Sequence, residues 1–229
     1  MAFPMTHLQV AYELLEVLPG IKDPCTFIVG SIAPDSVHFR EGYNGKIKAT
    51  SHIWRWGPKW GVTLELDKWM EDIKKFWNDN RFSFEDYDFI AGYTVHVLTD
   101  WMNDYYVWQP FDRQYRTVTW DGITYHGINE AQYDEIFAAF RKELAVMNVW
   151  LYGNSPDSDR ILDMLKKGKR YEYPGLIEAD DLDRAIDSLL YTQFSRMDDY
   201  GESACKDYTP EVVTDFIDKC VKEIPPILL

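Results

Sequence analysis

The sequence contains only three cysteines, Cys25, Cys205 and Cys220, and no two of them form a CxxC pair. Neither a disulfide framework nor a thiolate zinc site is therefore expected. No segment contains the roughly 18 consecutive apolar residues that a membrane-spanning helix needs, and the first residues lack the basic and apolar regions of a signal peptide. These absences predict a cytoplasmic protein with no stable membrane insertion.

Basic residues are also few, since 24 Lys and Arg stand against 38 Asp and Glu and give a formal net charge of -14. Such a surface repels polyanions unless metal ions or a local basic patch reverse the field near a site. Duplex nucleic acid and anionic membranes are therefore expected to be poor partners. With 229 residues, 46% of them hydrophobic, the chain can bury one core, and we predict a single domain over residues 1–229.

Helical spacing of apolar residues dominates the chain. Helices are predicted over residues 6–18, 63–78, 84–106, 129–152, 157–167 and 179–196, with a last one from residue 209. Thr6 and Ser83 are expected N-caps, and Ser83 is expected to form a capping box with Asp86. Asp121-Gly122 lies between two short β-prone runs and predicts a two-residue hairpin turn. The expected fold is all-α, with one small β-hairpin and a metal site between helices.

Two segments without a clear helical period also bear on function. Residues 27–33 form a short apolar run that stops at Pro34, so Asp35 is expected just beyond the end of an element and locally exposed. Residues 42–61, which include His52, are expected to be a loop. Trp54, Trp56 and Trp60 follow His52 closely, and core packing is favoured over a ligand platform for them.

Only five histidines occur, and several have carboxylates at spacings that metal sites use. His96 and Asp100 are four residues apart on a predicted helix, so imidazole nitrogen and carboxylate oxygen can converge on one ion such as zinc. Taken alone, the pair is also explained by a helical salt bridge or by a hydrogen-bonded core histidine. His126 and Glu130 repeat the spacing, but Glu130 equally suits the first turn of a helix.

The order of the short motifs is more specific than any one of them. They are Thr6-His7-Leu8, Gly30-Ser31-Ile32-Ala33-Pro34-Asp35, Lys48-Ala49-Thr50-Ser51-His52 and Gly92-Tyr93-Thr94-Val95-His96-Val97-Leu98-Thr99-Asp100. In this order they resemble the zinc-dependent phospholipase C family, over roughly the first 130 residues. The superfamily also contains single-strand nucleases of similar architecture. The resemblance implies a mostly helical fold that holds one to three zinc ions.

The resemblance also implies which residues bind metal. Its expected ligands are His7, Asp35, His52, His96, Asp100, His126 and Glu130. Asp35, His52, His96 and Asp100 would hold the best-defined ion, His7 would share Asp100 with a second, and His126 and Glu130 would serve a further one. Two departures stand out. Secreted members use the amino terminus of the mature chain as a ligand, whereas Met1 here precedes His7 by six residues. The family also places a histidine shortly after the helical aspartate, and here Asp104, one turn beyond Asp100, is the expected oxygen ligand in its place.

The function that follows as an expectation is zinc-dependent hydrolysis of a phosphodiester, with a phospholipid head group or a small phosphate ester as substrate. Metal ions would activate water, and Asp35 would orient or deprotonate that water. His38, three residues beyond Asp35, is an additional histidine that could contact a metal ion. The alternatives are a nuclease-like phosphodiesterase and a non-catalytic binding module stabilised by a structural metal. An HD-type phosphohydrolase is disfavoured because no His-Asp pair is adjacent in the sequence.

Overall fold

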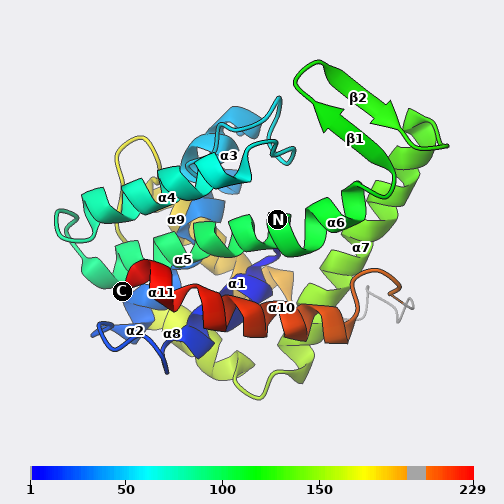
Figure 1. The fold of residues 1–229 in the computed structure, drawn as a ribbon. Coiled ribbons are helices and arrows are strands. Elements are labelled where there is room, and N and C mark those ends of the chain that lie inside the picture. Colours follow the sequence, from blue (N-terminus) through cyan, green and yellow to red (C-terminus); the bar gives the residue numbers. More distant parts are fainter. Residues whose placement is uncertain (1, 195–204) are drawn as a thin grey trace.

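Helix α5 (Tyr87–Asn103) runs through the middle of the computed structural model, which describes residues 2–194 and 205–229 (Figure 1). Every residue of α5 from Asp88 to Asp100 is buried. A helix that is apolar on most of its circumference is stable only inside a core, and any polar side chain that it carries there needs a partner. The buried polar residues of α5 include His96 and Asp100.

The other elements precede and follow α5 along the chain. Those before it are α1 (Pro4–Leu14), α2 (Pro24–Gly30), the 3-10 helix η1 (Ala33–Phe39), α3 (Gly45–Ser51) and α4 (Leu66–Asn80). Those after it are the π-helical turn η2 (Asp104–Trp108), α6 (Gln109–Asp112), β1 (Arg116–Thr119), β2 (Gly122–Tyr125), α7 (Glu130–Asn154), α8 (Ser158–Lys167), α9 (Ala179–Ser188), the π-helical turn η3 (Leu189–Gln193), α10 (Pro210–Glu223) and α11 (Pro225–Leu228).

Helices from both ends of the sequence pack around α5. It contacts α1, α2, α4, η1 and α10, and Figure 1 shows α4 and α10 on opposite sides of it. The buried hydrophobic side chains form one core cluster that extends from Met5 to Leu228. The two-stranded hairpin projects beyond the helices near the start of α7 (Figure 1). The predicted all-α class with a minor hairpin is confirmed. Among the described residues, no helix combines the length and the apolarity that crossing a bilayer requires.

Two glycines let α2 and α5 cross with their backbones in close contact. A β-carbon on Gly30 would lie 2.2 Å from the carbonyl oxygen of Phe89, and one on Gly92 would lie 2.0 Å from that of Phe27. No larger residue fits either position without moving a helix. The crossing brings Ser31, at the end of α2, next to the turn of α5 that carries His96. The glycines of the second and fourth motifs therefore have a packing role.

The starts of two predicted helices, over residues 6–18 and 84–106, differ from the structure. Helix α1 begins at Pro4 rather than after Thr6, because proline lacks the N–H that the first turn leaves unpaired and has a fixed helical φ. The N-cap of α5 is Asp86, which accepts a hydrogen bond from the N–H of Phe89. Ser83 instead donates to the carbonyl oxygen of Asp79. The predicted Ser83 capping box was therefore wrong by one turn.

The segments around Asp35 and His52 are more ordered than the sequence suggested. Pro34 occupies the first turn of η1 instead of ending an element, so Asp35 lies inside this 3-10 helix and is half-buried. The predicted loop over residues 42–61 contains α3, whose N-cap Asn44 accepts from the N–H groups of Lys46 and Ile47. His52 is the residue that ends this helix. Both corrections place a candidate ligand on a helix rather than in a flexible segment.

The hairpin and the later helices largely follow the prediction. Thr119 pairs with Gly122, so the turn residues are Trp120 and Asp121, one position before the predicted Asp121-Gly122 turn. Helix α7 begins after Asn129, which forms a capping box with Gln132. Helix α9 ends at Ser188 and continues as η3. The predicted end of this helix at residue 196 lies outside the described residues.

Candidate metal centre

His96 lies on the buried face of α5, and the preceding helix fixes the orientation of its ring. Its Nδ1 lies 2.7 Å from the carbonyl oxygen of Ser31, an atom that can only accept a hydrogen bond. Nδ1 therefore carries the proton, an assignment that follows from the acceptor. The unprotonated Nε2 of His96 then points away from α2 with its lone pair free. A histidine held in this way is oriented as metal-binding histidines usually are.

His52 is oriented by the same kind of contact from α3. Its Nδ1 lies 3.0 Å from the carbonyl oxygen of Lys48, and its Nε2 lies 3.1 Å from Nε2 of His96. Nδ1 of His52 also lies 2.9 Å from the hydroxyl of Ser51, so this hydroxyl and the carbonyl group together set its tautomer. When Nδ1 of His52 carries the proton, as Nδ1 of His96 does, neither Nε2 atom has a proton to donate to the other. Two lone pairs at this distance repel unless a cation lies between or beside them. The chemistry of the pair therefore suits a bound metal ion.

Two carboxylates complete the group around these nitrogens. Nε2 of His52 lies 3.2 Å from Oδ2 of Asp100 and 3.3 Å from Oδ1 of Asp35. Nε2 of His96 lies 3.9 Å and 3.7 Å from the same two oxygens. Ligand atoms about 2.0–2.1 Å from a tetrahedral zinc are roughly 3.3 Å apart, so these separations are close to those of a zinc site. Of the ligands of the best-defined predicted ion, His52, His96 and Asp100 form one group of donor atoms, and Asp35 belongs to a second group that shares His96.

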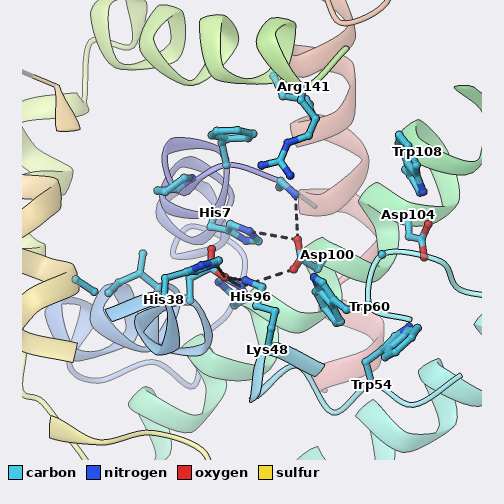
Figure 2. Close-up of a pocket in the computed structure, with 18 of the residues that line it drawn as sticks. His7, His38, Lys48, Trp54, Trp60, His96, Asp100, Asp104, Trp108 and Arg141 are labelled. Atoms are coloured by element: carbon cyan, nitrogen blue, oxygen red, sulfur yellow. Dashed lines mark hydrogen bonds and ion pairs between the residues drawn. The ribbon is translucent and has the colours of Figure 1, made fainter. Parts of the chain in front are cut away.

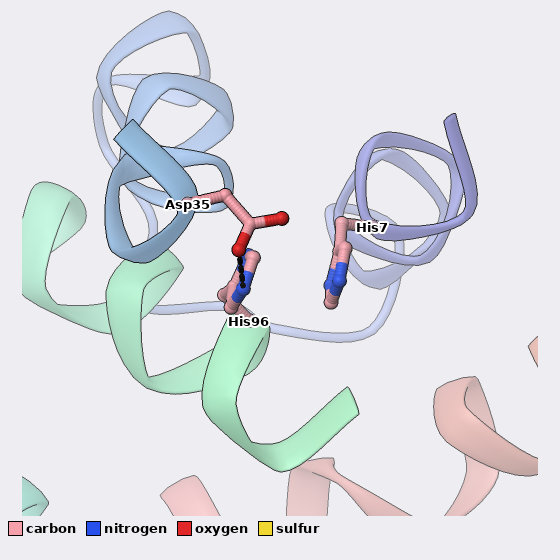
Figure 3. Close-up of side chains that lie close together, drawn as sticks. All are labelled: His7, Asp35 and His96. Carbon is pink, nitrogen blue, oxygen red and sulfur yellow. Dashed lines mark ion pairs between the residues drawn. The ribbon is translucent and has the colours of Figure 1, made fainter. Parts of the chain in front are cut away.

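His7 comes to the same place from α1. Its ring stacks on that of His96 with centroids 3.7 Å apart, and Figure 3 shows the two rings side by side next to the carboxylate of Asp35. Nε2 of His7 lies 3.4 Å from Oδ1 of Asp100. That oxygen also accepts from the backbone N–H of Ala2 at 3.0 Å. The start of the described chain therefore reaches the centre.

Several buried polar atoms of this centre have no hydrogen-bond partner among the described residues. They are both ring nitrogens of His7 and Oδ2 of Asp100. Leaving such atoms unpaired in a core costs about 1–3 kcal/mol each, unless an ion or water occupies the space that they face. Within the described chain, the donor atoms form two groups that share His96: His7, Asp35 and His96, and His52, His96 and Asp100. Nitrogen and oxygen donors of this kind fit zinc.

Burial sets the protonation state of the centre. It holds the pKa of His96 well below the ordinary value, and the nearby His7 lowers it further. Burial and then the charge of Lys48 lower the pKa of His52 to about 3. For Asp100, burial favours the neutral acid, but the contacts with His52 and His7 outweigh it and leave the pKa well below the usual range. Neutral imidazoles beside an ionised carboxylate are the forms that bind a metal ion.

Lys48 is a fully buried residue of the centre that the sequence did not single out. Its amino group contacts Oδ1 of Asp35 directly, and burial lowers its pKa to about 7. The lysine is four residues before His52, so both side chains lie on one face of α3. This relation is readable in the sequence once residues 45–51 are assigned to a helix. Lys48 places a positive charge beside the carboxylate that the resemblance assigns to water activation.

The centre opens into a cavity of about 350 Å³. His7, Asp35, His96 and Asp100 line one side of it, and Figure 2 shows Trp54 and Trp60 below them with Arg141 on the opposite wall. Much of the remaining wall is apolar. This volume is typical of a small-molecule site, in which apolar walls surround a few polar groups. Trp60 also packs edge-on against His52, with ring centroids 4.8 Å apart, so it supports the centre as well as lining the cavity.

Asp104 and His38 line the cavity but belong to neither ligand group. Asp104 begins the π-helical turn η2, is buried, and leaves Oδ1 without a partner among the described residues. Burial raises its pKa to about 6. His38 is more exposed, and its Nε2 lies 3.7 Å from Oδ1 of Asp35. The structure therefore places Asp104, predicted as a ligand, in the cavity wall rather than in a ligand group.

His126 and Glu130 are not brought to the centre. Both are exposed, and Nε2 of His126 lies 2.9 Å from the hydroxyl of Thr117 across the hairpin. Neither residue lines the cavity or belongs to a ligand group within the described chain. Glu130 is the first residue of α7, where a carboxylate interacts favourably with the helix dipole. We therefore remove these two predicted ligands from the centre.

Comparison of the chain with protein-family models, with curated proteins and with solved structures gives no match. The resemblance to the zinc-dependent phospholipase C family therefore rests on the ordered motifs alone and stays a prediction.

Proposed function

We propose that this protein is a zinc-dependent hydrolase of phosphate esters. The observation that carries the proposal is the approach of the Nε2 atoms of His52 and His96, 3.1 Å apart, beside two carboxylates. The order of the motifs supports the same function through the resemblance. We keep phosphodiesters as the expected substrates on that ground, and a cytoplasmic location stays a prediction from the sequence.

The residues have separable roles in this proposal. His52, His96 and Asp100 would hold the principal ion, and His7 with Asp35 a neighbouring one. A bound divalent ion would polarise the phosphate oxygens and lower the pKa of water toward neutrality. Asp35 is half-buried and lines the cavity, so its carboxylate can orient or deprotonate the attacking water. The apolar cavity wall would exclude bulk water from the ester.

A different function, a binding module with a purely structural metal, is favoured by one observation. The amino group of Lys48 pairs with Asp35 and can neutralise this carboxylate in place of a second metal ion. A structural zinc is saturated by protein ligands, whereas a catalytic zinc keeps a position open to solvent. The ligands here line a cavity, and this supports the catalytic proposal over the structural one.

The test is substitution of Asp35 by Asn in protein loaded with zinc. We expect hydrolysis of bis(4-nitrophenyl) phosphate to fall by about 100-fold or more, because general-base catalysis contributes roughly 10²–10⁴-fold. The matched control is Asp72→Asn. Side chains of Asp35 and Asp72 are 21% and 19% exposed, and each pairs with a cation, but Asp72 does not line the cavity. The panel of substrates also includes a dinucleotide, whose hydrolysis tests the nuclease-like alternative.

Elemental analysis and circular dichroism accompany the kinetics. Retention of activity in Asp35→Asn, with Asp72→Asn equal to wild type, would exclude Asp35 as the base. Zinc bound without hydrolysis of any ester in the panel would favour the structural module. If the wild type binds no zinc after zinc is supplied, the hydrolase proposal fails.

A further inference from the structure

Arg141 is the feature of the cavity that the proposed chemistry leaves unexplained. Phe137, Arg141 and Leu144 occupy successive turns of one face of α7, and all three line the cavity. Figure 2 shows the guanidinium of Arg141 directed from this wall toward Asp100 and His7. Its surroundings are otherwise largely apolar. Arg141 is exposed to solvent as well as lining the cavity, and its guanidinium can reach an anion bound there.

The guanidinium has no carboxylate partner among the described residues. It lies over the ring of Phe137, with 5.9 Å between the guanidinium carbon and the ring centroid. By contrast, Arg116 pairs with Asp112 and Arg184 pairs with Asp181. A guanidinium has donors arranged to bind two oxygens of a phosphate or carboxylate at once. Because Arg141 is exposed, water can satisfy these donors, and an anion in the cavity can replace that water.

The charge balance of the cavity also favours an anion. Its described lining carries three carboxylates, Asp35, Asp100 and Asp104, and two basic side chains, Lys48 and Arg141. One divalent ion at the centre makes the balance positive while Lys48 is protonated and neutral when it is not, although the whole chain is strongly acidic. A quaternary ammonium group would face a guanidinium on one side and metal-bound carboxylates on the other. Such a head group is repelled in this cavity, whereas a second negative charge is attracted.

We propose that Arg141 selects phosphate esters that carry a second negative charge, either a dianionic phosphate monoester group or another anion on the same molecule. This inference rests on the proposed hydrolase function and narrows its substrate class. It disfavours zwitterionic choline esters, which the resemblance alone would include. Arg141 acts here by binding the substrate, and no proton transfer is assigned to it.

The experiment compares zinc-loaded wild type with Arg141→Gln, Arg141→Lys and Lys142→Gln. Lys142 is the adjacent exposed residue, does not line the cavity, and gives the same change of charge. The substrates are 4-nitrophenyl phosphate, which is a dianion above neutral pH, and 4-nitrophenyl phosphocholine, which is zwitterionic. For Arg141→Gln we expect kcat/KM on the dianion to fall about 10- to 100-fold, as the loss of a charged hydrogen-bonded pair implies. The choline ester should change about twofold or less, on the same reasoning.

A second measurement does not depend on turnover. Calorimetric titration of inorganic phosphate into the zinc-loaded proteins should show about tenfold weaker binding to Arg141→Gln than to wild type, with zinc content unchanged. Arg141→Lys should recover much of the binding, and Lys142→Gln should equal wild type.

The outcomes separate the two proposals. If wild type hydrolyses the esters but Arg141→Gln affects both equally, or neither, the Arg141 proposal is wrong and the hydrolase proposal stands. If wild type hydrolyses no ester, the hydrolase proposal fails. Phosphate binding still decides the role of Arg141 in that case, because equal binding to wild type and Arg141→Gln overturns it.

Discussion

Two histidine–carboxylate pairs in this chain have the same spacing and opposite surroundings. His96 and Asp100 lie on buried α5, whereas His126 and Glu130 are exposed at the base of the hairpin. In the first pair, other segments supply the neighbours: His7, His52 and Asp35 all approach within a few ångströms. In the second pair, His126 contacts Thr117 of the neighbouring strand. Spacing gives both pairs a common face, but only packing gives one of them further ligands.

The comparison also shows what prepares a buried pair for a metal. The crossing at Gly30 and Gly92 holds the carbonyl of Ser31 against Nδ1 of His96 and fixes its tautomer. Helix α3 orients the ring of His52 through the carbonyl of Lys48 and the hydroxyl of Ser51. These second contacts orient the ligands before any ion binds. The exposed pair has no equivalent support among the described residues.

The largest expected difference between the pairs is in metal binding. His96→Ala should abolish high-affinity zinc binding, because His96 belongs to both ligand groups. His126→Ala should bind as much zinc as the wild type. Elemental analysis of protein purified without a metal-affinity tag measures this directly, with circular dichroism to confirm that the helices remain.

The opposite result would reverse the comparison. If zinc is lost in His126→Ala and retained in His96→Ala, then the centre is at the hairpin and the buried group is a hydrogen-bonded core. Equal loss in both variants would mean that the hairpin closes onto the centre when metal binds.

A smaller effect is expected from the packing that supports the buried pair. In Gly92→Ala the new β-carbon would lie 2.0 Å from the carbonyl oxygen of Phe27, so α2 and α5 must separate. Overpacking of this kind costs about 3 kcal/mol, and the separation should also weaken zinc binding by lengthening the contact between Ser31 and His96. Urea unfolding and zinc titration measure the two effects.

Gly45→Ala is the matched control for this substitution. Its β-carbon would meet only the β-carbon of Trp60, at an ordinary contact distance of 3.8 Å. Its stability should therefore stay within about 0.5 kcal/mol of wild type. If Gly92→Ala is as stable as Gly45→Ala, the close crossing does not explain the glycine of the fourth motif.

Sequence periodicity predicted most of the fold because buried helices leave a strong apolar pattern. It failed where helices are short: residues 45–51 have too few turns to show a period, and Pro34 was interpreted as a stop although it begins η1. The hairpin was placed correctly, but its turn was predicted one position too late, because Gly122 pairs in the strand and does not form the turn. Local chemistry predicts that an element exists more reliably than where it begins and ends.

The centre was predicted in part for a related reason. Ordered motifs supplied His7, Asp35, His52, His96 and Asp100, which the structure brings together. The role of Lys48 was not predicted, because the helix that places its side chain beside His52, α3, was itself predicted as a loop. Arg141 was missed because nothing in the sequence around α7 says that its side chain faces a cavity built largely by other helices. His126 and Glu130 show the opposite error, in which a correct spacing lacks tertiary support.

The smallest expected effect is on the pH dependence of stability, in a comparison of the buried carboxyl group of Asp104 with the exposed one of Glu130. Burial raises the pKa of Asp104 to about 6, so the folded protein holds this proton more tightly than the unfolded chain does. The contribution of Asp104 to stability is therefore fully present below the unfolded value of about 4 and is lost as the pH rises through about 6. Asp104→Asn removes this loss. In the absence of metal, the free energy of unfolding of the variant relative to wild type should increase by on the order of 2 kcal/mol as the pH rises from about 4 to about 8.

Urea unfolding in EDTA at both pH values measures the gain, and Glu130→Gln is the control. Because Glu130 is exposed at the start of α7, its substitution should change stability by no more than about 0.5 kcal/mol at either pH. A pH-independent effect of Asp104→Asn would mean that the buried carboxyl is solvated when the protein is folded. The stated gain would instead mean that the ionised form of Asp104 destabilises the folded protein when no metal is bound. The aspartate would then be retained at a cost to stability, as expected of a residue that serves the site.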